Sequence, residues 1–129
     1  MTTLNVLIVD DSQTDAELIA LALRRAGYAS TWQRVDTPGT VLAALQSRIT
    51  WDVITCDYSM PRLTAGTALD LVQSLAPTVP VVIVAGTLTE ETASELKRRG
   101  AETVVTKQRL DALATVVRRL RRRRHERDS

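Results

Sequence analysis

Apolar and polar residues follow one another along the chain in two recurring patterns. Short apolar runs bounded by polar residues, such as 4–9 and 81–84, predict buried strands. Between these runs lie segments whose apolar residues recur every three or four positions, as in 18–26, and this spacing predicts helices with one buried face. The expected strands are 4–10, a weaker 30–35, 52–57, 81–84 and 103–106.

Residues typical of helix ends bound the expected helices. Ser12 is a favoured N-cap for the first helix, Gly27 is a natural stop for it, and Pro38 opens the second. A loop is expected at 60–66. The remaining helices are expected at 67–76, at 90–99 with a stop at Gly100, and from about Arg109 with an apolar face that ends at Leu120.

The strand and helix patterns together repeat a βα unit five times. The right-handed crossover rule makes such a sheet parallel, with helices on both faces. Strands rich in Val, Ile and Leu fit a sheet that is covered on both sides. We therefore expect an α/β fold, a doubly wound five-stranded parallel sheet of order 2-1-3-4-5 with (βα)5 flavodoxin-like topology.

Size and composition favour one globular domain. A chain of 129 residues with 44% hydrophobic content is long enough to bury one core. No stretch approaches the ~18–20 apolar residues of a membrane span, and the N-terminus lacks the features of a secretory signal. The single cysteine, Cys56, lies in an expected strand and favours a reduced core residue. We expect a cytoplasmic protein.

The net charge of +2 hides an asymmetry along the chain. Residues 1–117 carry 10 basic and 13 acidic side chains, whereas residues 118–129 carry seven arginines and two acids. Because arginine is a good helix former, we expect a domain at 1–120 and an arginine-rich helical extension, or the start of a linker, at 121–129. No aromatic residues interleave with the arginines, so specific nucleic-acid recognition is not expected.

Carboxylates follow two of the expected strands at the point where each strand ends. Asp10 and Asp11 follow the first strand, and Asp57 ends the third. In a sheet of this order, the carboxyl ends of these two strands meet at the switch point, where ligands bind. Acids also favour helix starts, but Ser12 already serves as the cap of the helix that follows. The three carboxylates therefore predict an oxygen-rich site that suits Mg²⁺.

With two further features, the chain resembles the receiver domain of two-component response regulators over about 4–120. These features are the Met60-Pro61 pair that follows Asp57, and Lys107 directly after the fifth strand. The resemblance implies that Asp57 is the phosphoacceptor and that Lys107 pairs with the acyl phosphate. A carboxylate can attack phosphorus to form an aspartyl phosphate, and lysine supplies a point charge on a flexible stem.

The resemblance also implies a metal site and a phosphate site. Because Mg²⁺ keeps several waters, we expect it to bind Asp11 and Asp57 directly. We expect Asp10 to lie mainly in the next layer of residues, without coordinating the ion itself. The implied metal-site residues are Asp10, Asp11, Asp57 and the backbone carbonyl of Ser59, and the implied phosphate-site residues are Gly86, Thr87 and Ser59.

The chain departs from the usual receiver pattern at three positions. Ala85 stands where receivers usually have Ser or Thr, and Val104 stands where they usually have an aromatic residue. Gln108 replaces the usual proline after the lysine. We therefore expect a trans peptide between Lys107 and Gln108, because a non-proline cis bond costs about 2.5–4 kcal/mol. We also expect an atypical switch, with Thr87 either a substitute donor or an ordinary loop hydroxyl.

We consider three functions for these residues, of which the third, a phosphohydrolase, lacks a residue that it would need. The first is a phosphorylatable switch, not an enzyme, which accepts a phosphoryl group from a histidine kinase or phosphotransfer protein and acts on a downstream signalling domain or as a homodimer. The second is a receiver-fold docking module that works largely without phosphorylation. A Mg²⁺-dependent phosphohydrolase would need an acid two residues after Asp57, where Ser59 stands. Neither a P-loop nor a Gly-rich nucleotide motif is present.

Overall fold

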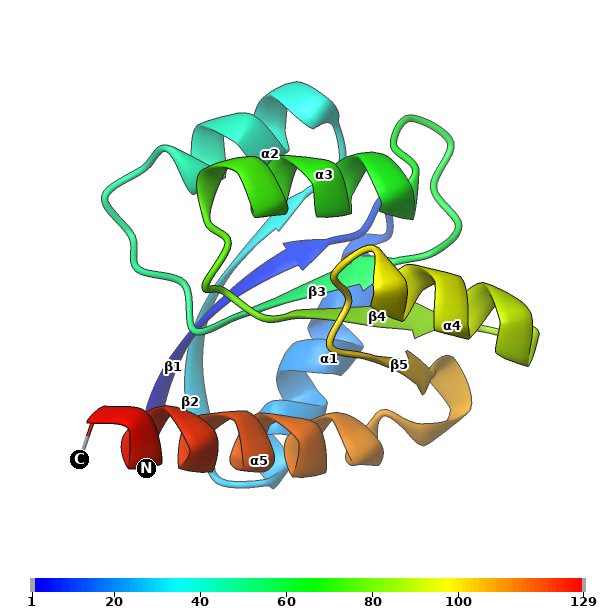
Figure 1. Cartoon of the computed structure of the whole chain (residues 1–129). Helices are drawn as coiled ribbons and strands as arrows, with labels where there is room; N and C mark the ends of the chain where they lie inside the picture. The colour runs from blue at the N-terminus through cyan, green and yellow to red at the C-terminus, as the bar shows by residue number, and fades with distance from the viewer. Residues whose placement is uncertain (1, 129) are drawn as a thin grey trace.

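The computed structural model describes residues 2–128, with five strands and five α-helices in strict alternation. The strands are parallel, in the order β2-β1-β3-β4-β5 (Figure 1), as expected. The strands are β1 (Thr2–Val9), β2 (Tyr28–Val35), β3 (Val53–Asp57), β4 (Val81–Ala85) and β5 (Thr103–Thr106). The helices are α1 (Gln13–Arg25), α2 (Pro38–Leu45), α3 (Ala65–Leu75), α4 (Glu90–Arg98) and α5 (Asp111–Asp128).

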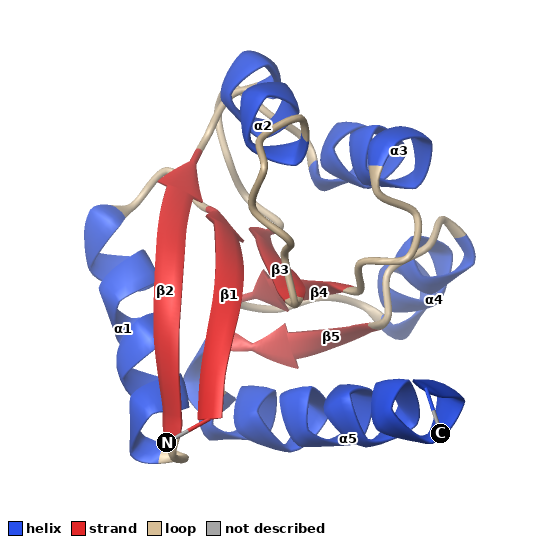
Figure 2. Ribbon diagram, turned by 90° about the vertical axis from the view of Figure 1, so that its left-hand side faces the viewer, coloured by secondary structure: helices blue, strands red, loops and turns tan. Residues whose placement is uncertain are grey.

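Helices cover both faces of the sheet, with α1 and α5 on one face and α2, α3 and α4 on the other (Figure 2). Alternate residues of each strand point to opposite faces, so each strand contributes to both cores. In β1, Val6 and Ile8 join the core under α1 and α5, whereas Leu7 and Val9 join the core under α2 and α3. Cys56 is buried in β3, so it is a core residue as expected, and burial raises the pKa of its thiol to about 12.

Strand register brings the ends of the strands to one edge of the sheet. Val9 pairs with Cys56, Asp57 with Val84, and Ala85 with Thr106. The residues that follow β1, β3, β4 and β5 therefore meet at the same carboxyl edge. Chain segments that are far apart in sequence are joined there, and the candidate site lies among them.

Capping residues set the helix ends, and the start of α3 differs by two residues from the sequence-based prediction, as does the start of α5, at Asp111 where about Arg109 was predicted. The Ser12 hydroxyl accepts a hydrogen bond from the backbone N–H of Asp15 (3.1 Å), so α1 starts as expected. The helix α3 begins at Ala65, two residues before the predicted start, because the hydroxyl of Thr64 caps the N–H of Thr67 (3.1 Å). Gly66 therefore lies in the first turn of α3, and the prediction that it belongs to a loop was wrong.

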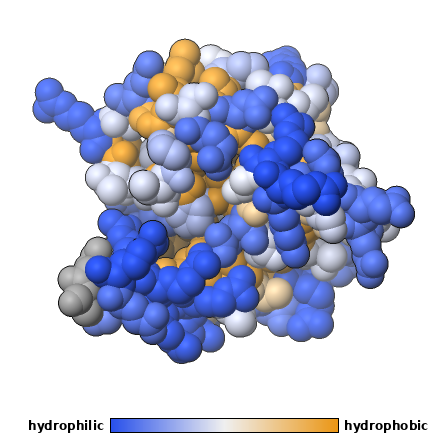
Figure 3. Space-filling view, viewed as in Figure 1, coloured by the Kyte–Doolittle hydropathy of each residue, from blue (hydrophilic) through white to orange (hydrophobic). Residues whose placement is uncertain are grey.

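The C-terminal helix is preceded by a 3₁₀ turn at Lys107–Arg109 and then runs from Asp111 to Asp128. The described chain contains no cis peptide bond, which confirms the trans peptide expected between Lys107 and Gln108. Residues 121–128 continue the helix, and Ser129 lies outside the described residues. Hydrophilic side chains gather over α5 in Figure 3. Among the described residues, none of the helices is both long and apolar enough to cross a membrane.

Two ion pairs tie the arginine-rich end of α5 to the body of the protein. Arg123 contacts Glu102, just before β5, at 2.6 Å, and Arg124 contacts Asp52, just before β3, at 3.1 Å. Leu120, the last residue of the apolar face, is buried at 9% exposure. The extension is thus a continuation of α5 along the amino-terminal side of the sheet.

Candidate functional site

Three carboxylates lie together at the carboxyl edge of the sheet. Asp10 follows β1 and Asp57 ends β3, and both are buried; Asp11, on the β1–α1 turn, is exposed. One oxygen of each lies within 4.8 Å of one oxygen of each of the others. The structure thus brings together the three acids that the sequence pattern placed at the switch point.

Asp10 is held from one side only. Its Oδ1 accepts a hydrogen bond from the backbone N–H of Ser12 (2.9 Å), while its Oδ2 is buried without a hydrogen-bond partner among the described residues. Burial raises the pKa of Asp10 to about 6, and the nearby charge of Asp57 adds to this rise, while the hydrogen bond from Ser12 opposes it. A buried carboxylate oxygen without a donor is a suitable place for a cation or for a water bound to one.

Asp57 is 3% exposed and its Oδ1 has two nitrogen neighbours. The backbone N–H of Ser59 donates to it at 3.3 Å, and the Nζ of Lys107 lies 3.3 Å away. The carboxylate therefore faces the edge of the sheet with a cation beside it, while its backbone stays in the buried strand β3.

Lys107 extends from the turn after β5 and contacts two acids. Its Nζ lies 3.3 Å from Asp57 Oδ1 and donates to Asp15 Oδ2 at the same distance of 3.3 Å. Burial alone lowers the pKa of Lys107, but the charges and hydrogen bonds of Asp57 and Asp15 outweigh it and raise the pKa above its ordinary value. The expected pairing of Lys107 with the acidic site therefore has a second partner, Asp15.

Two residues at this edge were missed from sequence. Asp15 lies in the first turn of α1, three residues after the N-cap Ser12, and that spacing alone indicates only a capping box. Arg34, near the end of β2, donates to the backbone carbonyl of Asp10 (3.2 Å) and to the side chain of Gln13 (3.0 Å). Arg34 thereby braces the turn that carries Asp10 and Asp11, and no local sequence signal marks it.

The predicted phosphate-site residues lie in two exposed loops. Ser59 follows β3 beside Asp57, and Gly86 and Thr87 follow β4; all three are exposed. The Thr87 hydroxyl has no hydrogen bond to any of the described residues. Ala85 is buried at the end of β4, so the position from which receivers usually offer a hydroxyl has none here.

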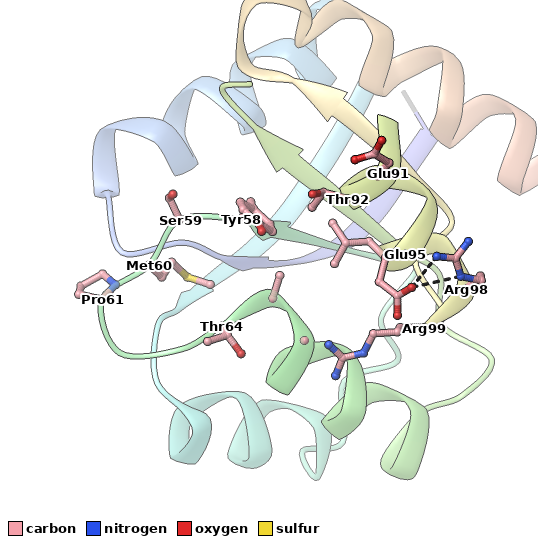
Figure 4. Close-up of a pocket in the computed structure, with 13 residues that line it drawn as sticks. Tyr58, Ser59, Met60, Pro61, Thr64, Glu91, Thr92, Glu95, Arg98 and Arg99 are labelled. Atoms are coloured by element: carbon pink, nitrogen blue, oxygen red, sulfur yellow. Dashed lines mark hydrogen bonds and ion pairs between the residues drawn. The ribbon is translucent and has the colours of Figure 1, made fainter. Parts of the chain in front are cut away.

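A groove opens beside the site, between the β3–α3 loop and α4 (Figure 4). It has a volume of about 920 Å³. Tyr58 and Met60 line one wall, and Glu91 and Glu95 on α4 line the other. At the far end, Arg99, the residue directly after α4, pairs with Asp70 of α3 (3.3 Å). Leu96 is the buried residue of α4, so this helix is less deeply embedded than its neighbours.

The donor set fits a hard divalent cation. Carboxylate and carbonyl oxygens are the ligands that Mg²⁺ prefers, and two or three negative charges at one point need a cation to offset their repulsion. The partnerless Oδ2 of Asp10 supports the same assignment. The cluster of Asp10, Asp11 and Asp57 is therefore a candidate Mg²⁺ site.

Comparison with known families decides the class of this protein. The model of the response regulator receiver domain family matches residues 6–118. The chain belongs to this family. Receiver domains are signalling modules of two-component systems, and the family typically binds Mg²⁺. The resemblance inferred from the acidic residues and Lys107 is thus confirmed.

Known proteins similar to this receiver domain include both enzymes and regulators. It is 41% identical over 87 residues to a protein-glutamate methylesterase/protein-glutamine glutaminase of Gluconobacter oxydans, a match that covers 66% of this chain and 24% of that protein. The receiver domain of the Francisella response regulator 1452 superposes with a TM-score of 0.79 at 25% identity, covering 93% of this chain and 98% of that one. NtrX from Brucella abortus matches with a TM-score of 0.79 at 25% identity, over 98% of this chain and 30% of that one.

Proposed function

We propose that this receiver domain accepts a phosphoryl group on Asp57 from a histidine kinase or phosphotransfer protein, with Mg²⁺. One observation carries the proposal: the buried Asp57 carboxylate lies at the switch-point edge beside both Asp10–Asp11 and the Lys107 ammonium. A nucleophile, a group of oxygen ligands and a cation are what phosphoryl transfer to a carboxylate needs.

The chemistry can be assigned residue by residue. An Asp57 oxygen forms a new bond to phosphorus while the bond between phosphorus and the donor breaks, and its electron pair leaves with the donor. A phosphohistidine donor takes up a proton as its imidazole leaves. Lys107 pairs with a phosphoryl oxygen, and Ser59, Gly86 and Thr87 line the space around the group. Asp11, Asp57 and the Ser59 carbonyl would hold Mg²⁺, with Asp10 behind them, and the ion would offset charge on the phosphoryl oxygens.

Phosphorylation of the protein by a small acyl-phosphate donor tests the assignment directly. We expect one phosphoryl group per chain in the presence of Mg²⁺, mapped to Asp57, and its loss in Asp57→Asn. Asp70→Asn, which removes an exposed carboxylate of α3, is the control and should incorporate phosphate as the wild type does. Unchanged incorporation in Asp57→Asn would show that the site is elsewhere.

The setting of this reaction belongs to the same proposal. The phosphoryl donor is a histidine kinase or phosphotransfer protein in the cytoplasm, and the output is a downstream signalling domain or a homodimer. We propose no enzymatic activity beyond phosphoryl transfer to its own Asp57. The activities named for the Gluconobacter protein are that protein's, and the match covers 24% of its length.

We also propose that the conformational response to phosphorylation is weak. The buried Ala85 offers no hydroxyl to a phosphoryl group, and the half-buried Val104, packed against the core under α4, offers no ring to turn inward. A ligand shifts a two-state equilibrium only by its differential affinity for the two states. One missing hydrogen bond to a charged phosphoryl group forfeits roughly 1.5–3 kcal/mol of that difference.

Backbone amide shifts, recorded with and without a phosphoryl mimic, measure this response. We expect small changes in α4 and β5 of the wild type and larger ones in Ala85→Thr, which restores a hydroxyl at the end of β4. If Thr87 moves in as a substitute donor, Thr87→Ala reduces the wild-type response further. A large rearrangement that survives Thr87→Ala would contradict the weak switch.

The same two positions favour one alternative function, a receiver-fold module that docks partners largely without phosphorylation. Without the hydroxyl and the ring, the phosphorylated and unphosphorylated surfaces would differ little. The lifetime of the aspartyl phosphate separates the two functions. A stable acyl phosphate supports the switch, and no detectable acyl phosphate with either a small donor or a phosphohistidine protein supports the docking module.

A further inference from the structure

Asp15 is a carboxylate at the edge of the site to which the proposed phosphoryl transfer gives no role. It lies in the first turn of α1, and its side chain is 38% exposed. Its Oδ2 accepts a hydrogen bond from the Nζ of Lys107 at 3.3 Å, across 92 positions of sequence. The same nitrogen lies 3.3 Å from Asp57 Oδ1. One ammonium therefore bridges two carboxylates from different elements.

The capping pattern of α1 leaves this carboxylate available. Ser12 and Asp15 have the spacing of a capping box, in which the acid would reach back to the N–H of the cap residue. Here that N–H donates to Asp10 Oδ1 instead (2.9 Å). The Asp15 carboxylate therefore does not cap α1, and it accepts a hydrogen bond from Lys107. Asp10, Asp15 and Lys107 also line one small cavity of about 50 Å³, which places Asp15 at the rim of the site.

The position of the Lys107 ammonium affects whether the Asp57 carboxylate can reach an incoming phosphoryl group. An ammonium that had Asp57 as its one anionic partner would neutralise the nucleophile and occupy the space that an incoming phosphoryl group must enter. A second carboxylate holds the ammonium to one side. Both contacts of Asp57 are made by Oδ1, so its Oδ2 stays open to phosphorus, and Lys107 remains within reach of a phosphoryl oxygen.

We infer that Asp15 is the positioning residue of Lys107, keeping its ammonium between Asp57 and the helix α1 so that it meets the phosphoryl group without blocking the nucleophile. This inference rests on the proposed phosphorylation of Asp57. It gives Asp15 no contact with the reacting atoms, because Asp15 acts through Lys107.

Whether substitution of Asp15 slows or speeds phosphorylation tests this positioning role. Removing a negative charge from the rim, by itself, speeds attack on an anionic donor, since repulsion falls. Losing the anchor of Lys107 slows it. We expect Asp15→Asn to slow phosphorylation by a small acyl-phosphate donor about two- to fivefold, the range for a half-exposed ion pair. Asp15→Glu should keep most of the rate, because it retains a carboxylate that can reach Lys107.

Two controls separate positioning from charge. Glu17→Gln removes a charge from the same helix, where Glu17 contacts Gln13 rather than Lys107, and should leave the rate equal or slightly higher. In a Lys107→Met background, Asp15→Asn should no longer slow the reaction. Equal or faster phosphorylation in Asp15→Asn, or the same slowing in the Lys107→Met background, overturns the inference.

A spectroscopic readout does not depend on phosphorylation. The chain has two lysines, Lys97 and Lys107, so ¹³C-lysine labelling yields two side-chain signals. Asp15→Asn should move the Lys107 signal and leave that of the exposed Lys97 in place. A Lys107 signal that does not move overturns the inference while the proposed function stands. If the wild type accepts no phosphoryl group but the signal moves, the proposed function fails and the Asp15–Lys107 contact remains.

Discussion

Asp10 is the residue whose ionisation is most clearly coupled to folding. Burial raises its pKa from 3.8 to about 6 in the folded protein. Between these two values the folded state binds more protons than the unfolded state does. The free energy of unfolding therefore falls as the pH rises through this window, and above pH 6 the folded protein carries the full cost of a buried charge.

Replacing Asp10 with Asn should relieve that cost. The amide keeps an oxygen for the N–H of Ser12 and removes the charge, so we expect the metal-free variant to be about 1–3 kcal/mol more stable at pH 7. The gain should shrink toward zero near pH 4. Urea unfolding at both pH values, with the exposed Asp70→Asn as control, measures it. An equal gain at pH 4 and pH 7 would contradict the coupling.

At the scale of elements, the attachment of α4 to α3 depends on its last residues. Gly100, just after α4, has a φ of +116°, and a Cβ there would collide with the side-chain amide of Gln73 on α3. Leu96 is the buried residue of this helix. The C-terminal end of α4 is therefore closely fitted to α3 at Gly100, although the groove over Tyr58 runs along the helix from Glu91 to Arg99.

Alanine at Gly100 should destabilise the protein by about 1–2 kcal/mol, because left-handed backbone is strained for a residue with a Cβ. Gly39 is the matched control: it lies in α2, and a Cβ there would meet no atom within 4 Å. Gly39→Ala should leave stability equal or raise it by up to ~1 kcal/mol, the helix propensity difference. Thermal unfolding of the two variants compares them, and equal losses in both would refute the assignment.

At the scale of the whole molecule, charge is concentrated on one helix. Arg123 and Arg124 pair with the body of the protein, whereas Arg118, Arg119 and Arg122 are exposed with no acidic partner among the described residues. Such a surface attracts polyanions by counterion release alone, without reading sequence.

We expect weak, salt-dependent binding to duplex DNA with no preference for sequence. The double variant Arg119→Gln/Arg122→Gln should weaken DNA binding and lower its salt slope by up to ~0.9 per lost phosphate contact. Arg123→Gln should lower the slope less, because Arg123 is paired with Glu102. Fluorescence anisotropy over a salt series measures both. Sequence-specific binding that survives moderate salt would contradict this expectation.

The order of elements and the three acids could be predicted from the chain itself. Apolar periodicity is a local property, and it located all five strands and all five helices because burial on two faces requires it. Asp10, Asp11 and Asp57 could be placed together because parallel strands end at one edge. The start of α3 was missed because Thr64 and Thr67 both suit a helix start, and only the hydrogen bond between them shows which of them is the cap.

The tertiary structure alone decided which side chains complete the site. Lys107 could be assigned to the acidic edge, but its contact with Asp15 joins residues 92 positions apart through the packing of α1 beside α5. The bond from Arg34 to the Asp10 carbonyl depends on the register of β2 against β1. Neither contact could be predicted from the spacing of residues in the sequence or from its composition. Charge and hydrogen bonding act over a few ångströms in space, and folding alone sets which residues come that close.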